Sequence, residues 1–85
     1  MSEDSPGGGR HLRKRSFTVA GHRTSVALEP EFWAALETAA ARRGISLAAL
    51  IALLDARRTA SRMPLASALR VFALAEVEAT APRRG

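Results

Sequence analysis

The fold of this chain is decided by residues 23–54, which read RTSVALEPEFWAALETAAARRGISLAALIALL. The run opens with a short alternating segment in which Val26 and Leu28 lie two residues apart, the pattern of a half-buried β-strand. A lone strand has two open edges of unpaired backbone groups and therefore needs a partner. Because no second clean strand lies inside this run, we expect the partner to be the same strand of another copy, in a dimer built around a two-stranded ribbon.

Two helices are predicted after this strand. Proline suits the first helical position, where its missing N–H is not needed, so the first helix is expected from about Pro30 to Arg43. Gly44 suits the left-handed position that closes a helix. Ser46 is a good N-cap for the second helix, which is expected to end near Arg57 and Arg58. The buried stripe of that second helix is expected to contain Leu47, Leu50, Ile51 and Leu54, widened by Leu53.

The segment before the run also carries β-type signals, and its parity differs from that of the run. Phe17 and Val19 are odd positions, whereas Val26 and Leu28 are even, so in one regular strand the two pairs would face opposite sides. The register must reset between them, and Gly21 tolerates a turn or a bulge. Residues 15–20 are therefore either the second strand of a hairpin or a bulged extension of one long strand, and the sequence leaves both open.

A third helix is predicted from near Pro64 to about Ala79, after a loop at 59–63. Its apolar stripe consists of Leu65, Leu69 and Phe72, with Ala68 and Val71 at the edges. The predicted organisation is a disordered basic arm at 1–13, one folded domain at 14–79 and a flexible tail at 80–85.

Positive charge is concentrated at the start of the chain. The 85 residues carry a net charge of +5, and residues 1–28 hold five basic groups against two acids. Residues 29–59 hold four of each sign, so the helical middle is neutral. A focused basic segment suggests a polyanionic partner, although a solvated tail that aids solubility is the simpler reading.

The composition argues against several classes of site. The chain has no cysteine, which excludes disulfides and thiolate metal sites. His11 and His22 have no carboxylate at ligand spacing, so we expect no metal and no cofactor. The few Ser, His and Asp residues fit no nucleophile–base order, so an enzyme is not expected. No apolar run approaches the roughly 20 residues of a membrane span, and the polar N-terminus lacks a secretion signal. A cytoplasmic protein is expected, nucleoid-associated if it binds DNA.

The order and spacing of these elements resemble the ribbon–helix–helix family of MetJ and Arc, which read DNA with a β-ribbon. The matching segments are 24–36, TSVALEPEFWAAL, and 43–51, RGISLAALI. The resemblance covers about residues 22–56. The lead-in at 21–25 and the added third helix resemble a bacterial subgroup of that family.

This resemblance implies a mainly α-helical protein with one short β-strand per chain. Two copies would form an intertwined homodimer, and an intermolecular antiparallel ribbon would enter the major groove of double-stranded DNA. Alternation turns Thr24, Val26 and Leu28 toward the core, so base reading is expected from Arg23, Ser25 and Ala27. Phosphate contacts are expected from Arg13, Lys14, Arg15, Ser46 and Leu47. The dimer core is expected to contain Val26, Leu28, Phe32, Trp33, Leu36, Leu50 and Ile51.

A second interpretation is a dimer that acts as a protein-interaction or antitoxin-like module with weak or no DNA binding. The small side chains of Ser25 and Ala27 favour it, because Arg23 is then the only long polar side chain on the outward face. A segment 15–20 that folded back over that face would favour it further. A basic helix on a membrane surface is not expected, because the arginines gather at helix ends and in the arm. The position of residues 15–20 therefore discriminates between the two main hypotheses.

Overall fold

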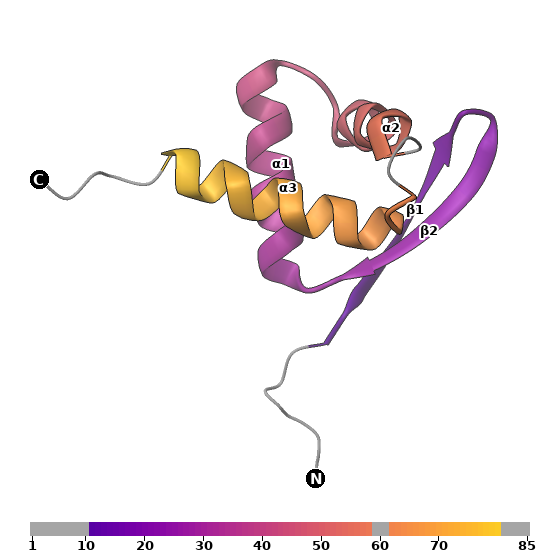
Figure 1. The fold of residues 1–85 in the computed structure, drawn as a ribbon, viewed down its shortest axis with the longest axis horizontal. Coiled ribbons are helices and arrows are strands. Elements are labelled where there is room, and N and C mark those ends of the chain that lie inside the picture. The colour runs from indigo at the N-terminus through magenta and orange to yellow at the C-terminus, as the bar shows by residue number, and fades with distance from the viewer. Residues whose placement is uncertain (1–10, 59–61, 81–85) are drawn as a thin grey trace, which may run out of the picture.

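The computed structural model describes residues 11–58 and 62–80. Two strands are followed by three helices, in the order β1 (Arg13–Val19), β2 (His22–Leu28), α1 (Pro30–Arg43), α2 (Leu47–Arg58) and α3 (Leu65–Thr80) (Figure 1). The expectations for residues 1–10, for the loop at 59–61 and for the tail at 81–85 lie outside the described residues. β1 begins at Arg13, which had been expected to end the arm.

The strands form an antiparallel hairpin within one chain, which corrects the expectation of one strand per chain. β1 pairs with β2 from Arg13 opposite Leu28 to Val19 opposite His22. β2 therefore finds a partner on one edge without a second copy. The prediction of a single strand, which the resemblance implied, was wrong because β1 lies before the run at 23–54, and only Phe17 and Val19 of its seven residues are strongly apolar.

A two-residue turn at Ala20 and Gly21 joins the strands. Both residues have positive φ, at 51° and 80°, as the type I′ turn of a tight hairpin requires. In this register each odd residue of β1 faces an even residue of β2. The hairpin register thus accounts for the difference in parity, and of the two alternatives left open for residues 15–20 the hairpin is confirmed.

Helix α1 begins and ends where its local signals predict. Pro30 is the first residue, and Gly44 closes the helix with φ 69°. The Gly44 N–H donates to Ala41 O and the Ile45 N–H donates to Ala40 O, each at 3.0 Å. These bonds satisfy carbonyls that the helix end would otherwise leave unpaired.

Helix α2 starts directly after its predicted cap. The Ala49 N–H donates to Ser46 Oγ at 3.0 Å, the side-chain bond of an N-cap. Leu50, Ile51 and Leu54 of this helix are buried as expected, but Leu53 is 51% exposed and does not widen the buried stripe.

The core lies between the hairpin and the helices. α2 packs against β1, α3 packs against β2, and α1 contacts both other helices (Figure 1). Of the seven residues expected in a dimer core, six are buried within this single chain and Phe32 is partly buried. The fully buried large side chains are Leu28, Leu36, Leu50, Ile51 and Leu69. One copy therefore encloses this core without a partner.

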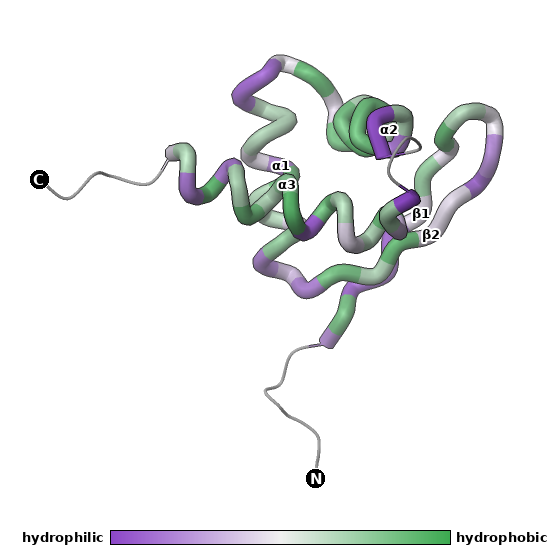
Figure 2. The backbone as a smooth tube through the Cα atoms, in the orientation of Figure 1, coloured by the Kyte–Doolittle hydropathy of each residue, from purple (hydrophilic) through white to green (hydrophobic). Residues whose placement is uncertain are grey.

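Helix α3 is apolar on two sides. Leu65, Leu69 and Ala73 are buried, whereas Val71, Leu74 and Val77 are 58%, 58% and 52% exposed. Figure 2 shows hydrophobic colouring along much of this helix. Among the described residues, no helix is both long enough and apolar enough to span a bilayer.

Candidate nucleic-acid interface

The hairpin has one face turned to the helices and one face turned to solvent. Phe17, Val19, Val26 and Leu28 are buried, and side chains alternate along a strand. The intervening residues therefore form the opposite face, which we call the outer face. Its members are paired across the hairpin as Lys14 with Ala27, Ser16 with Ser25 and Thr18 with Arg23.

The outer face is polar and carries only positive charge. Five of its six side chains are exposed, and Ala27 is half-buried. Ser16 Oγ and Ser25 Oγ lie 2.8 Å apart and share a hydrogen bond. Lys14 and Arg23 have no side-chain hydrogen bond or ion pair within 11–58 and 62–80. The two cations are therefore available to an anionic ligand.

The structure separates the three basic residues expected to bind phosphate. Lys14 belongs to the outer face, whereas Arg13 and Arg15 lie on the helix-facing side of β1. Arg15 Nη1 donates to Glu37 Oε2 at 2.8 Å, and its guanidinium carbon lies 5.2 Å from the ring centre of Trp33. Arg15 thus joins β1 to α1, through a charge-assisted hydrogen bond and a cation–π contact.

Trp33 has a structural role at this junction. Its side chain is only 4% exposed, and its Nε1–H donates to Arg13 O at 2.8 Å. Its ring centre lies 5.9 Å from that of Phe17. The indole therefore ties the first residues of β1 to α1 and presents no open stacking surface.

The start of α2 offers backbone donors. Ser46 Oγ accepts the Ala49 N–H and so caps the helix. The N–H groups of Leu47 and Ala48 lie in the first turn, where a helix supplies no backbone acceptor. Such a terminus favours an anion, as the sequence led us to expect for Ser46 and Leu47.

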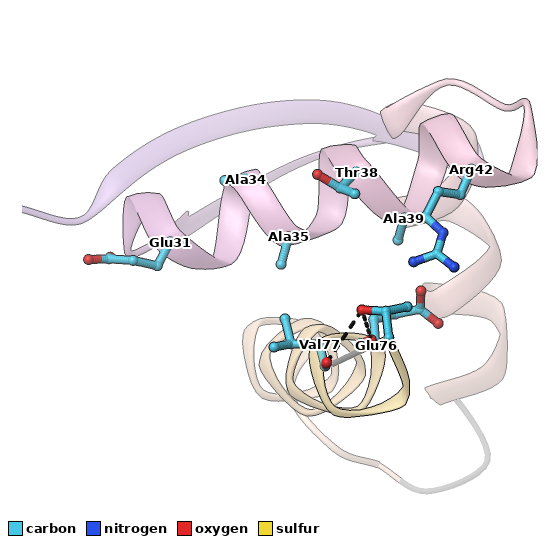
Figure 3. A pocket seen from close by; sticks show the side chains of 9 residues that line it. Glu31, Ala34, Ala35, Thr38, Ala39, Arg42, Glu76 and Val77 are labelled. Atoms are coloured by element: carbon cyan, nitrogen blue, oxygen red, sulfur yellow. Dashed lines mark hydrogen bonds between the residues drawn. The ribbon is translucent and has the colours of Figure 1, made fainter. Parts of the chain in front are cut away.

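A separate hollow lies between α1 and α3 and has a different character. Its volume is about 290 Å³, and it is lined largely by small side chains of α1 facing Glu76 and Val77 of α3 (Figure 3). Beside it, Arg43 Nη2 donates to Glu76 Oε2 at 2.8 Å. This bond lowers the pKa of the Glu76 carboxyl and raises the pKa of the Arg43 guanidinium. The pair joins the two helices.

Across the described ranges, no group of three or more His, Asp or Glu residues gathers where it could hold a metal. Among residues 11–58 and 62–80, the outer face combines two unpaired cations, Lys14 and Arg23, with three exposed hydroxyl groups. The sequence placed Arg23, Ser25 and Ala27 on it correctly by alternation, but Ser16 and Thr18 were missed. Their signal was present, because each neighbours an apolar residue of β1 that is buried.

Comparison with known proteins identifies the family. A family model described as a ribbon–helix–helix domain matches residues 12–77, from the start of the hairpin almost to the end of α3. Neither the comparison with curated proteins nor that with solved structures found a match. The match spans most of the chain, including β1 and α3, which lie outside the resembling run at residues 22–56. The chain therefore belongs to the ribbon–helix–helix family, whose members are generally DNA-binding regulators.

Proposed function

We propose that this protein is a homodimeric DNA-binding regulator that presents the outer face of its hairpin to the major groove. The observation that carries the proposal is the outer face itself, which is exposed, free of acids and supplied with Arg23 and Ser25. An arginine can bind guanine through two hydrogen bonds, and a serine hydroxyl can donate or accept. Ala27 is small enough to meet a thymine methyl group.

The proposed dimer uses the second edge of β2. In a tight hairpin the pair beside the turn exchanges hydrogen bonds, and bonded pairs alternate with non-bonded pairs. The peptide groups of Arg23, Ser25 and Ala27 therefore point away from β1. No strand occupies that edge within the described part of the chain, so it is open to the same strand of a second copy.

Backbone phosphates are proposed to be held by Lys14 and by the start of α2 at Ser46 and Leu47. Arg13 and Arg15 lie on the other side of β1, so they would reach phosphate only from the rim of the sheet. We therefore propose that Lys14 contributes more than either arginine, because Arg15 is already engaged with Glu37.

The test is binding to duplex DNA across a salt series, together with the mass of the free protein in solution. We expect a dimer whose affinity falls steeply as salt rises, because bound phosphates release counterions. The variant Ala27→Pro removes one N–H from the open edge of β2, which should yield a monomer that keeps its hairpin by circular dichroism. A dimeric wild-type protein without salt-sensitive binding to any duplex would refute the proposal.

A second candidate function is a protein-interaction or antitoxin-like module. Val71 and Leu74 favour it, because two large apolar side chains are more than half exposed on one side of α3. Leu74→Lys distinguishes the candidates. It should abolish capture of a protein partner while leaving duplex affinity unchanged, whereas Arg23→Ala should do the reverse.

A further inference from the structure

The hairpin makes the proposed DNA-binding sheet wider than a ribbon of two strands. If β2 pairs with β2 of a second copy, the order becomes β1, β2, partner β2, partner β1. Neighbouring strands lie about 4.8 Å apart, so the two β1 strands lie roughly 14 Å apart. The major groove is about 12 Å wide and admits a two-stranded ribbon. The two β2 strands therefore fit into the groove and the two β1 strands do not.

We propose that β1 is a phosphate-contacting strand, whose Lys14 and Thr18 meet the DNA backbones on either side of the groove that β2 occupies. This inference rests on the proposed function and assigns to β1 a role distinct from base reading. Lys14 lies near one end of the outer face and Thr18 near the turn. The two residues thus reach the backbone at two separated points.

The chemistry of these side chains suits that role. Lysine ammonium and threonine hydroxyl groups commonly donate hydrogen bonds to phosphate oxygens. Such contacts position a protein on DNA without reading its sequence. Both residues are exposed, and neither side chain has a hydrogen-bond partner among residues 11–58 and 62–80. Ser16 differs, because its hydroxyl bonds Ser25 at 2.8 Å and so acts as a positioning residue for a base reader.

The experiment compares two duplexes of equal length, one selected by the wild-type protein from a random pool and one unrelated. Lys14→Gln and Thr18→Val should each weaken binding to both duplexes by the same factor, about tenfold for each copy that loses a bond to a charged group. Lys14→Gln should also lower the salt dependence by about one ion per copy. Arg42→Gln, on α1, is the matched charge control and should change neither the affinity for the duplexes nor its salt dependence. Arg23→Ala should instead reduce the ratio between the duplexes.

Neutral phosphates locate the contacts. A methylphosphonate placed at a phosphate that Lys14 contacts should weaken DNA binding by the wild-type protein and should leave DNA binding by the Lys14→Gln variant unchanged. The inference is overturned if Lys14→Gln and Thr18→Val alter the ratio between duplexes as Arg23→Ala does, because β1 would then lie in the groove. It is equally overturned if both variants bind like the wild type while Arg23→Ala binds weakly. A wild-type protein that binds neither duplex removes the proposed function itself, before any variant is compared.

Discussion

The two faces of the β-hairpin are formed by the same two strands but differ in character: one is apolar and buried, and the other is polar and exposed. The helix-facing side contains Phe17, Val19, Val26 and Leu28, all buried. The outer face contains hydroxyls and two cations that bond nothing in the helices. Because side chains alternate, each residue of one set is followed by a residue of the other. The buried side chains and the side chains proposed to contact DNA thus occupy alternate positions of one short sequence, and substitutions should separate their effects.

The largest expected effect is on the helix-facing side. Leu28 is fully buried, so Leu28→Ala should lower the free energy of unfolding by about 2–5 kcal/mol through lost transfer energy and a residual cavity. Urea denaturation measures this change. Ser25→Ala on the outer face is the control and should shift stability by less than about 0.5 kcal/mol. Equal losses of unfolding free energy in the two variants would mean that the two faces contribute equally to stability, which would contradict this comparison.

The second largest expected effect is a loss of DNA affinity when Arg23 on the outer face is replaced. Arg23→Ala should leave stability unchanged but weaken binding to the preferred duplex by about 1–3 kcal/mol for each copy that holds a guanine. Arg23→Lys sharpens the test, because lysine keeps the charge and lacks the planar fork. We expect the lysine variant to retain the salt dependence and lose the sequence preference in an anisotropy titration. An unchanged preference would remove Arg23 from base reading.

The turn that aligns the two faces should show a smaller effect. Gly21 has φ 80°, and a Cβ built there meets no atom within 4 Å. Gly21→Ala should therefore lower the free energy of unfolding by about 1–2 kcal/mol, from backbone strain alone. Ala20 also has positive φ, at 51°, so Ala20→Asn should raise the melting temperature by creating the preferred Asn-Gly turn. Melting temperatures that move in the same direction would contradict this account of the turn.

The smallest effect lies outside the hairpin, at the pair formed by Arg43 and Glu76. The hydrogen bond from Arg43 lowers the pKa of Glu76, so the ionised carboxyl stabilises the fold above its unfolded pKa. That contribution is lost as the pH falls through the lowered value. Glu76→Gln should therefore melt slightly below the wild type at neutral pH and converge with it in acid. Duplex affinity should not change, because neither face of the hairpin is touched.

Local signals account for most of what could be predicted. Pro30 and Gly44 specify the ends of α1 through their backbone conformations, and Ser46 specifies the start of α2 through its hydroxyl. Alternation also predicted that Arg23 and Ser25 point outward. It is a local rule too, because it depends only on neighbouring residues of one strand and not on which strand pairs with it. The pairing of β1 with β2 could not be settled in this way, because a turn and a bulge at Gly21 both reset the parity.

The helices, the helix-facing side of β2 and the ribbon–helix–helix resemblance could all be predicted from the sequence, because caps, alternation and apolar spacing act within a few residues of each other. The folded chain was needed to show that β1 completes the sheet within one chain and that Arg15 contacts Glu37 and Trp33. The contacts of Arg15 join residues about 20 positions apart, and they depend on how α1 packs against the hairpin. The pairing of β1 with β2 joins residues 3 to 15 positions apart, and it depends on the turn at Ala20 and Gly21. The same packing left Lys14, Ser16 and Thr18 exposed beside Arg23, which widened the candidate DNA surface from one strand to two.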